Sequence, residues 1–153
     1  EMKKYIAIIF SLFLLYGCGI AKYKSLKLGN IDSSDKSITV PGAGMSLFEI
    51  KSALLNDGWK VKVGDASLLE TGTNASKINS KTQGTHYTAY RMYMSYSIRT
   101  NNNHGITTFN ISIVSNKTNE EVLNMVGNRE DFVRYKPEEL ASNLVKNLRE
   151  IQR

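Results

Sequence analysis

The alternation of apolar and polar residues between positions 86 and 99 constrains the fold of this chain more than any other feature. Tyr90, Met92, Met94, Tyr96 and Ile98 fall on one side of an extended strand. A long strand with one apolar face needs neighbouring strands and a second layer that covers that face. Composition agrees, because 41% of residues are hydrophobic and 22% are charged, which is typical of a globular chain.

The residues that follow predict a hairpin and one more strand. Positions 101–105 contain turn residues, and apolar residues alternate again on the far side, so we expect a hairpin over 86–114. A second turn at 116–119 leads to a shorter strand near Val122 to Val126, which Gly127 is expected to end.

Two helices complete the predicted domain. Ser46 and Glu49 have the spacing of a capping box, so a helix is expected over 46–56 between short strands at 38–40 and 59–63. Pro137 suits the first position of a C-terminal helix. The order β-α-β-β-β-β-α predicts an α+β two-layer sandwich, with a mostly antiparallel sheet of about four to five strands and both helices packed on one face.

The N-terminus has the layout of an export signal. Lys3 and Lys4 precede an apolar run from Tyr5 to Leu15. This run is marginal as a permanent membrane span, which needs about 20 apolar residues. It ends beside Cys18, the single cysteine of the chain, so no intramolecular disulfide is possible.

Leu15-Tyr16-Gly17-Cys18 resembles the lipobox of bacterial lipoproteins, although Tyr16 is bulkier than the usual residue there. The resemblance implies that residues 1–17 are cleaved as a signal peptide. It further implies that Cys18 receives a diacylglycerol on its thiol and an acyl chain on its new amine. Two or more acyl chains hold a protein stably on a bilayer. With Gly19 as the second mature residue, the resemblance implies an outer-membrane anchor, with the protein facing the periplasm.

The mature chain is expected to consist of a tether and one domain. Residues 18–37, which comprise the lipidated cysteine and a polar segment without apolar period, are interpreted as a flexible tether with a span on the order of 25 Å. Residues 38–153 form the single globular α+β domain. In element order this domain resembles small envelope-assembly lipoproteins, such as curli-secretion and penicillin-binding-protein activator lipoproteins and the N-terminal domain of the Tol-system propeller protein. This resemblance implies a non-enzymatic docking role with an envelope protein as partner.

The wetter side of the long strand is the candidate binding face. It carries Tyr87, Arg91, Tyr93 and Arg99, and aromatic rings interleaved with arginine can stack on sugars and hold anions. The alternative function is therefore peptidoglycan or glycan binding, while the same tyrosines are also ordinary strand formers. The net charge of +6 suits an anionic membrane surface, an acidic glycan or nucleic acid, and it is also common in domains that bind none of these. Nucleic acid is not expected as a partner, because an exported domain rarely meets it.

No set of residues predicts catalysis. His86 and His104 have no neighbouring ligand at metal spacing, and Pro41 to Gly44 lacks the glycine spacing of a phosphate-binding loop. No pair of carboxylates stands out for acid-base chemistry. We expect neither enzymatic activity nor a metal, and no cofactor other than the lipid on Cys18.

Overall fold

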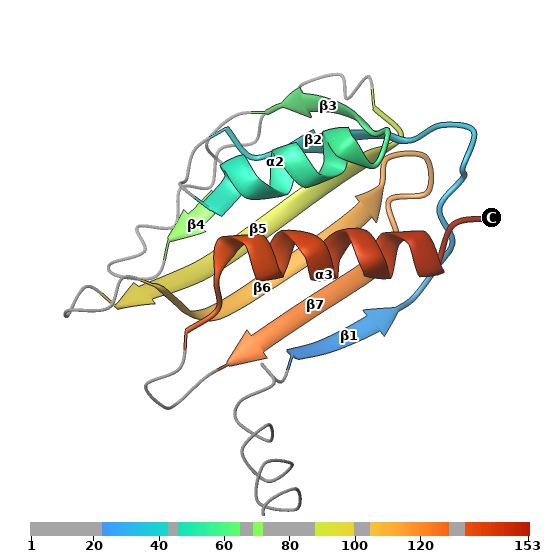
Figure 1. The fold of residues 1–153 in the computed structure, drawn as a ribbon. Coiled ribbons are helices and arrows are strands. Elements are labelled where there is room, and N and C mark those ends of the chain that lie inside the picture. The colour runs from blue at the N-terminus through green and yellow to red at the C-terminus, as the bar shows by residue number, and fades with distance from the viewer. Residues whose placement is uncertain (1–22, 43–45, 65–68, 72–87, 100–104, 129–133) are drawn as a thin grey trace, which may run out of the picture.

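The computed structural model describes residues 23–42, 46–64, 69–71, 88–99, 105–128 and 134–153. Strands of one sheet make the first layer, and two helices lie over one of its faces as the second layer (Figure 1). The α+β class predicted from the sequence is confirmed. The elements are β1 (Tyr23–Lys27), β2 (Ser37–Val40), α2 (Ser46–Asn56), β3 (Lys60–Val63), β4 (Leu69–Thr71), β5 (Tyr90–Arg99), β6 (Gly105–Ser115), β7 (Glu121–Asn128) and α3 (Pro137–Glu150).

The sheet has more strands than predicted and a mixed direction. Six of its seven described strands follow the order β1-β7-β6-β5-β2-β3, and the seventh, β4, pairs with β5 beside this path. The pairs β1–β7, β7–β6 and β6–β5 are antiparallel, whereas β2–β5, β2–β3 and β4–β5 are parallel. The prediction of four to five mostly antiparallel strands was therefore wrong in detail. α2 links β2 to β3 as a crossover, and a crossover through a helix places neighbouring strands parallel.

The predicted hairpin is present and forms the centre of the sheet. β5 and β6 pair along their whole lengths, and Tyr90, Met92, Met94 and Tyr96 are each at most 5% exposed. β7, the strand that follows this hairpin, was predicted to end at Gly127, but it continues through Gly127 to Asn128. A Cβ at this glycine would collide with the Phe109 ring, so the residue allows β7 to pass close to the core.

The segment predicted to be a flexible tether is part of the domain from Tyr23 onward. β1 pairs with β7 along all five of its residues. Ile31 is fully buried, and its backbone exchanges hydrogen bonds with Ile151 and Arg153 at 2.8 and 3.0 Å. Lys27 also forms an ion pair with Glu150. Pairing with an existing sheet edge orders this stretch despite its lack of an apolar period, because the backbone hydrogen bonds do not depend on side chains.

Both helices are amphipathic and cover the same core. α2 buries Leu47, Ile50 and Leu54, as predicted, and the chain leaves it through Gly58 at a φ of 81°. α3 begins at Pro137, lies beside α2 over the sheet, and turns its apolar face to the common core (Figure 1). The buried residues of α3 are Leu140, Ala141, Leu144, Val145, Asn147 and Leu148. Within the described residues, no helix combines the length and the apolar character that crossing a membrane requires.

Candidate functional site

The face of the sheet opposite the helices is called the open face here, and it contains the predicted binding residues that the structure describes. Cross-strand register places side chains on it in rows. One row runs Tyr93, Ser112, Asn124 and Leu26 across β5, β6, β7 and β1. A second row runs Ser95, Asn110, Val126 and Lys24. The open face is thus rich in hydroxyl and amide groups, because each strand alternates these residues with the buried ones.

Arg91 and Tyr93 lie together on this face. Nε of Arg91 donates to the Tyr93 hydroxyl at 2.7 Å, and the guanidinium carbon lies 5.6 Å from the centre of the Tyr93 ring. Arg99 ends β5 opposite Gly105 in the register. Tyr87 lies outside the described residues, as do Cys18, His86 and His104.

Most of the hydrogen-bonding capacity of Arg91 is used within the protein. Nη1 donates to Oδ1 of Asn116 at 2.5 Å, and Nη2 donates to Oδ1 of Asn119. Asn119 adopts a φ of 60°, a turn conformation that asparagine tolerates. Arg91 therefore holds the turn between β6 and β7. Tyr93, at 38% exposure, is the member of the pair whose ring is available to a ligand.

A polar pocket adjoins the Arg91 side of the open face. Asn116 lines it and donates to the carbonyl of Thr88 at 2.7 Å. Hydrogen bonds from the hydroxyl and the backbone amide of Ser34 hold the pKa of Asp32, another lining residue, below its ordinary value. This carboxylate is therefore ionised at neutral pH. The lining residues are Asp32, Asp35, Thr88, Ala89, Tyr90, Ser115, Asn116 and Lys117.

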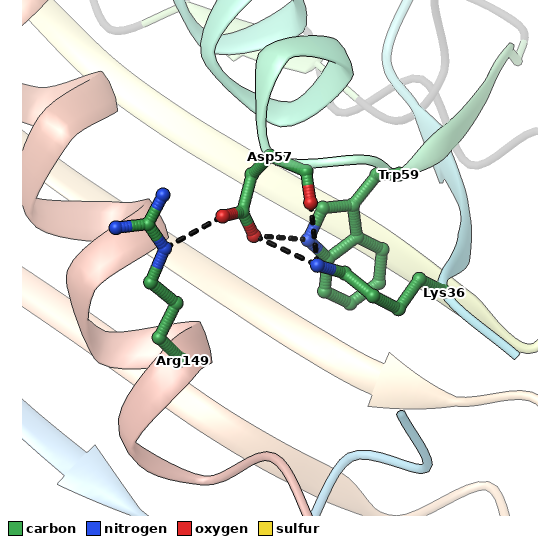
Figure 2. A network of polar contacts seen from close by, with 4 residues as sticks. All are labelled: Lys36, Asp57, Trp59 and Arg149. Carbon is green, nitrogen blue, oxygen red and sulfur yellow. Dashed lines mark hydrogen bonds and ion pairs between the residues drawn. The ribbon is translucent and has the colours of Figure 1, made fainter. Parts of the chain in front are cut away.

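A second polar cluster, the Asp57 network, lies between the helix layer and the edge of the sheet (Figure 2). Oδ2 of Asp57 accepts hydrogen bonds from Lys36 Nζ at 3.0 Å and Trp59 Nε1 at 3.1 Å. Oδ1 accepts from Arg149 Nε at 2.6 Å. Lys36 also lies 5.6 Å from the centre of the Trp59 ring and donates to the Asp57 carbonyl. The network joins the loop before β2, the turn after α2 and the end of α3.

The protonation of Asp57 follows from these contacts. Burial acts to raise its pKa, since the side chain is only 7% exposed. The hydrogen bonds and charges of Arg149 and Lys36 outweigh burial, and the pKa lies below its ordinary value. A general acid at neutral pH needs a raised pKa, so the direction of this shift does not favour that role for Asp57. Within the described ranges, no three His, Cys, Asp or Glu side chains are close enough to hold a metal ion.

Asp57 was not predicted as a site residue from the sequence. Its partners lie 21 and 92 residues away along the chain, so no local motif marks the network. The only local signal is the Asp57-Gly58-Trp59 turn, in which the Trp59 indole reaches back two residues to the carboxylate.

No family model matches the sequence, and no curated protein is similar to it. The fold is distantly similar to solved structures of PelC dodecamers from Paraburkholderia phytofirmans. A point variant in one crystal form gives a TM-score of 0.46 at 8% identity and covers 84% of this chain and 94% of that chain. A second PelC structure gives a TM-score of 0.44 at 9% identity with the same coverage. We transfer no residue role or activity from so distant a likeness.

Proposed function

We propose that this chain is a bacterial lipoprotein, anchored through lipid on Cys18, whose α+β domain docks onto another component of the cell envelope. The observation that carries the anchor is the motif Leu15-Tyr16-Gly17-Cys18. It stands directly after the apolar run from Tyr5 to Leu15 and contains the single cysteine. Sorting to the outer membrane, with the domain facing the periplasm, follows from Gly19 by the same resemblance.

Two properties of the domain support this proposal. Its helix layer carries a pocket between α2 and α3 that is lined by polar side chains such as Ser52, Ser142 and Lys146. The two described aspartates with shifted pKa values, Asp32 and Asp57, shift downward and stay ionised. A non-enzymatic role in envelope assembly or secretion is the function that fits these properties.

Mass spectrometry of chain isolated from cell membranes tests the anchor. We expect a mature N-terminus at Cys18 carrying diacylglycerol and an N-acyl chain, and a Cys18→Ser variant that leaves the membrane fraction. An unmodified Cys18 with residues 1–17 retained would refute the anchor.

In-cell crosslinking followed by purification tests the docking role. The test variant is Lys146→Glu on the exposed side of α3, and the matched control is Ser95→Arg on the open face. We expect a crosslinked envelope protein that is lost in the α3 variant and kept in the control. Recovery of the chain alone under all crosslinking conditions would count against docking.

A glycan-binding role is the second candidate, and the observation that favours it is the Tyr93 ring at 38% exposure beside Ser112 on the neighbouring strand. Stacking on an exposed ring with polar groups around it is a common way to bind sugars. Retention on purified peptidoglycan sacculi is the assay. Tyr93→Ala should abolish retention and Tyr93→Phe should preserve it. Unchanged retention in a variant that combines Tyr93→Ala with Arg91→Ala would exclude this face.

A further inference from the structure

The first strand begins very close to the proposed anchor. Cys18 and Tyr23 are five residues apart, so the connecting backbone spans at most about 18 Å when fully extended. β1 is also the last strand at its end of the sheet. With the proposed lipid on Cys18, this edge of the domain stays within about 18 Å of the anchor point at the bilayer surface.

Exposed apolar side chains gather at this edge. Leu26 on β1 is 59% exposed, Leu28 just after β1 is 56% exposed, and Val126 on β7 is 43% exposed. Leu26 and Val126 lie on the open face in adjacent rows, with Lys24 opposite Val126. Isolated exposed leucines are common in proteins, but three apolar side chains grouped beside a lysine form an amphipathic patch.

The described side chains of the open face are predominantly basic. Among the side chains that the structure describes, register places Lys24, Lys60, Lys62 and Arg91 on this face, against Glu121. The described side-chain acceptors of Arg91 are a hydroxyl and two amides, none of which carries charge, so its positive charge is retained. A basic surface with grouped leucines is complementary to a bilayer with anionic headgroups.

We propose that Lys24, Leu26, Leu28 and Val126 form a membrane-contact patch that lays the open face of the domain against anionic phospholipid headgroups. This inference rests on the proposed lipid anchor at Cys18. The anchor supplies attachment, and the patch supplies orientation. The helix layer, with α2 and α3, then points away from the membrane and toward soluble envelope components.

Orientation can be measured on the lipidated chain. Cys18 is occupied by lipid, so an introduced cysteine is the single free thiol and takes an environment-sensitive fluorophore. One variant carries Leu26→Cys in the patch, and its matched control carries Ser142→Cys on the exposed side of α3. Both are reconstituted into phosphatidylcholine vesicles with and without phosphatidylglycerol, and quenching by lipids brominated on their acyl chains is recorded together with vesicle flotation.

We expect lipid quenching at position 26, little at position 142, and a stronger signal with phosphatidylglycerol. Adding Lys24→Glu should lower the ratio of docked to undocked chain by at least about fivefold, the effect of one lysine near an anionic surface. Lys146→Glu on α3 should leave this ratio unchanged. Flotation with equal quenching at both positions would overturn the patch while the anchor stands. Absence of flotation would overturn the anchor and the patch together.

Discussion

Replacing Asp57 with asparagine should destabilise the domain, because Asp57 joins three segments of the chain through one buried carboxylate. The amide is nearly the same size, so packing is preserved and only charge and hydrogen bonding change. The amide oxygen can keep the Oδ2 position and accept from Lys36 and Trp59. Its NH₂ group then occupies the Oδ1 position and faces Arg149 Nε, donor against donor.

The magnitude follows from exposure. Lys36 is 21% exposed, so the loss of its ionic partner makes the largest contribution, about 1 to 1.5 kcal/mol. Its ammonium group then donates to a neutral amide oxygen in place of a carboxylate. Arg149 is 65% exposed and can turn into water, so its share is about 0.5 kcal/mol. The total is about 2 kcal/mol in the free energy of unfolding. For a domain of this size that corresponds to a decrease in Tm of about 8 °C.

The difference in the free energy of unfolding is measured by urea denaturation of the mature chain with Cys18→Ser, with tryptophan fluorescence as the signal. Glu120→Gln is the control, since it removes the same charge from an exposed turn and should change stability by less than about 0.5 kcal/mol.

The pH dependence of the stability difference is a second check. The pKa of Asp57 is lowered in the folded state, so its contribution is complete above the unfolded value of about 3.9 and is lost as pH falls through the folded pKa. The gap between wild type and Asp57→Asn should therefore close in acid. A gap no larger than that of Glu120→Gln at neutral pH would refute the reasoning.

Three further substitutions test other parts of the fold by the same denaturation assay. Gly127→Ala should cost about 1 to 3 kcal/mol, because the new methyl group overlaps the Phe109 ring; a neutral effect would mean that β7 shifts freely. Arg91→Gln should cost about 1 kcal/mol and speed hydrogen exchange in the turn between β6 and β7, and unchanged exchange would contradict its role as the clamp of that turn. Thr39→Val should cost about 1 kcal/mol, since it removes the buried 2.7 Å hydrogen bond to the Thr88 hydroxyl; a stabilised variant would show that the Thr88 bond to the Tyr90 carbonyl suffices.

The parts of the fold that were predictable have local periodic patterns. β5 alternates over ten residues and α3 follows the helical period. The buried face of each can therefore be predicted from its own residues, without the rest of the chain. β1 does not, because Lys24 and Leu26 are both exposed on one side while Tyr23 contributes only partial burial on the other. Its strand structure comes from hydrogen bonds to β7, about a hundred residues later in the chain, and distant pairing of this kind leaves no periodic trace.

The candidate site was predictable to a similar degree. Arg91 and Tyr93 were expected on one face because residues two apart in a strand point the same way. The hydrogen bonds from Arg91 to Asn116 and Asn119 could not be predicted, because they depend on where the turn between β6 and β7 lies relative to β5. Tyr93 is therefore the informative residue for ligand binding, and Arg91 the informative one for the turn.

The edges of the sheet indicate how a partner can approach the domain. β1 and β3 stand at the two ends of the strand order, and among the described residues no further strand pairs with the outer side of either. Both are short and lysine-bearing, with Lys24 and Lys27 in β1 and Lys60 and Lys62 in β3. Short edge strands with lysine disfavour addition of a further strand, because the charge must stay in water. Partners are then expected to bind through a face of the domain and not through an edge strand.

The two faces of the domain differ. The open face has mostly basic described side chains with grouped apolar ones, and the other face is built of α2 and α3. A short link to Cys18 would assign the first to the membrane and leave the helices for protein contacts, so a surface charge change on α3 should disturb crosslinking to partners without disturbing the contact of Leu26 with lipid.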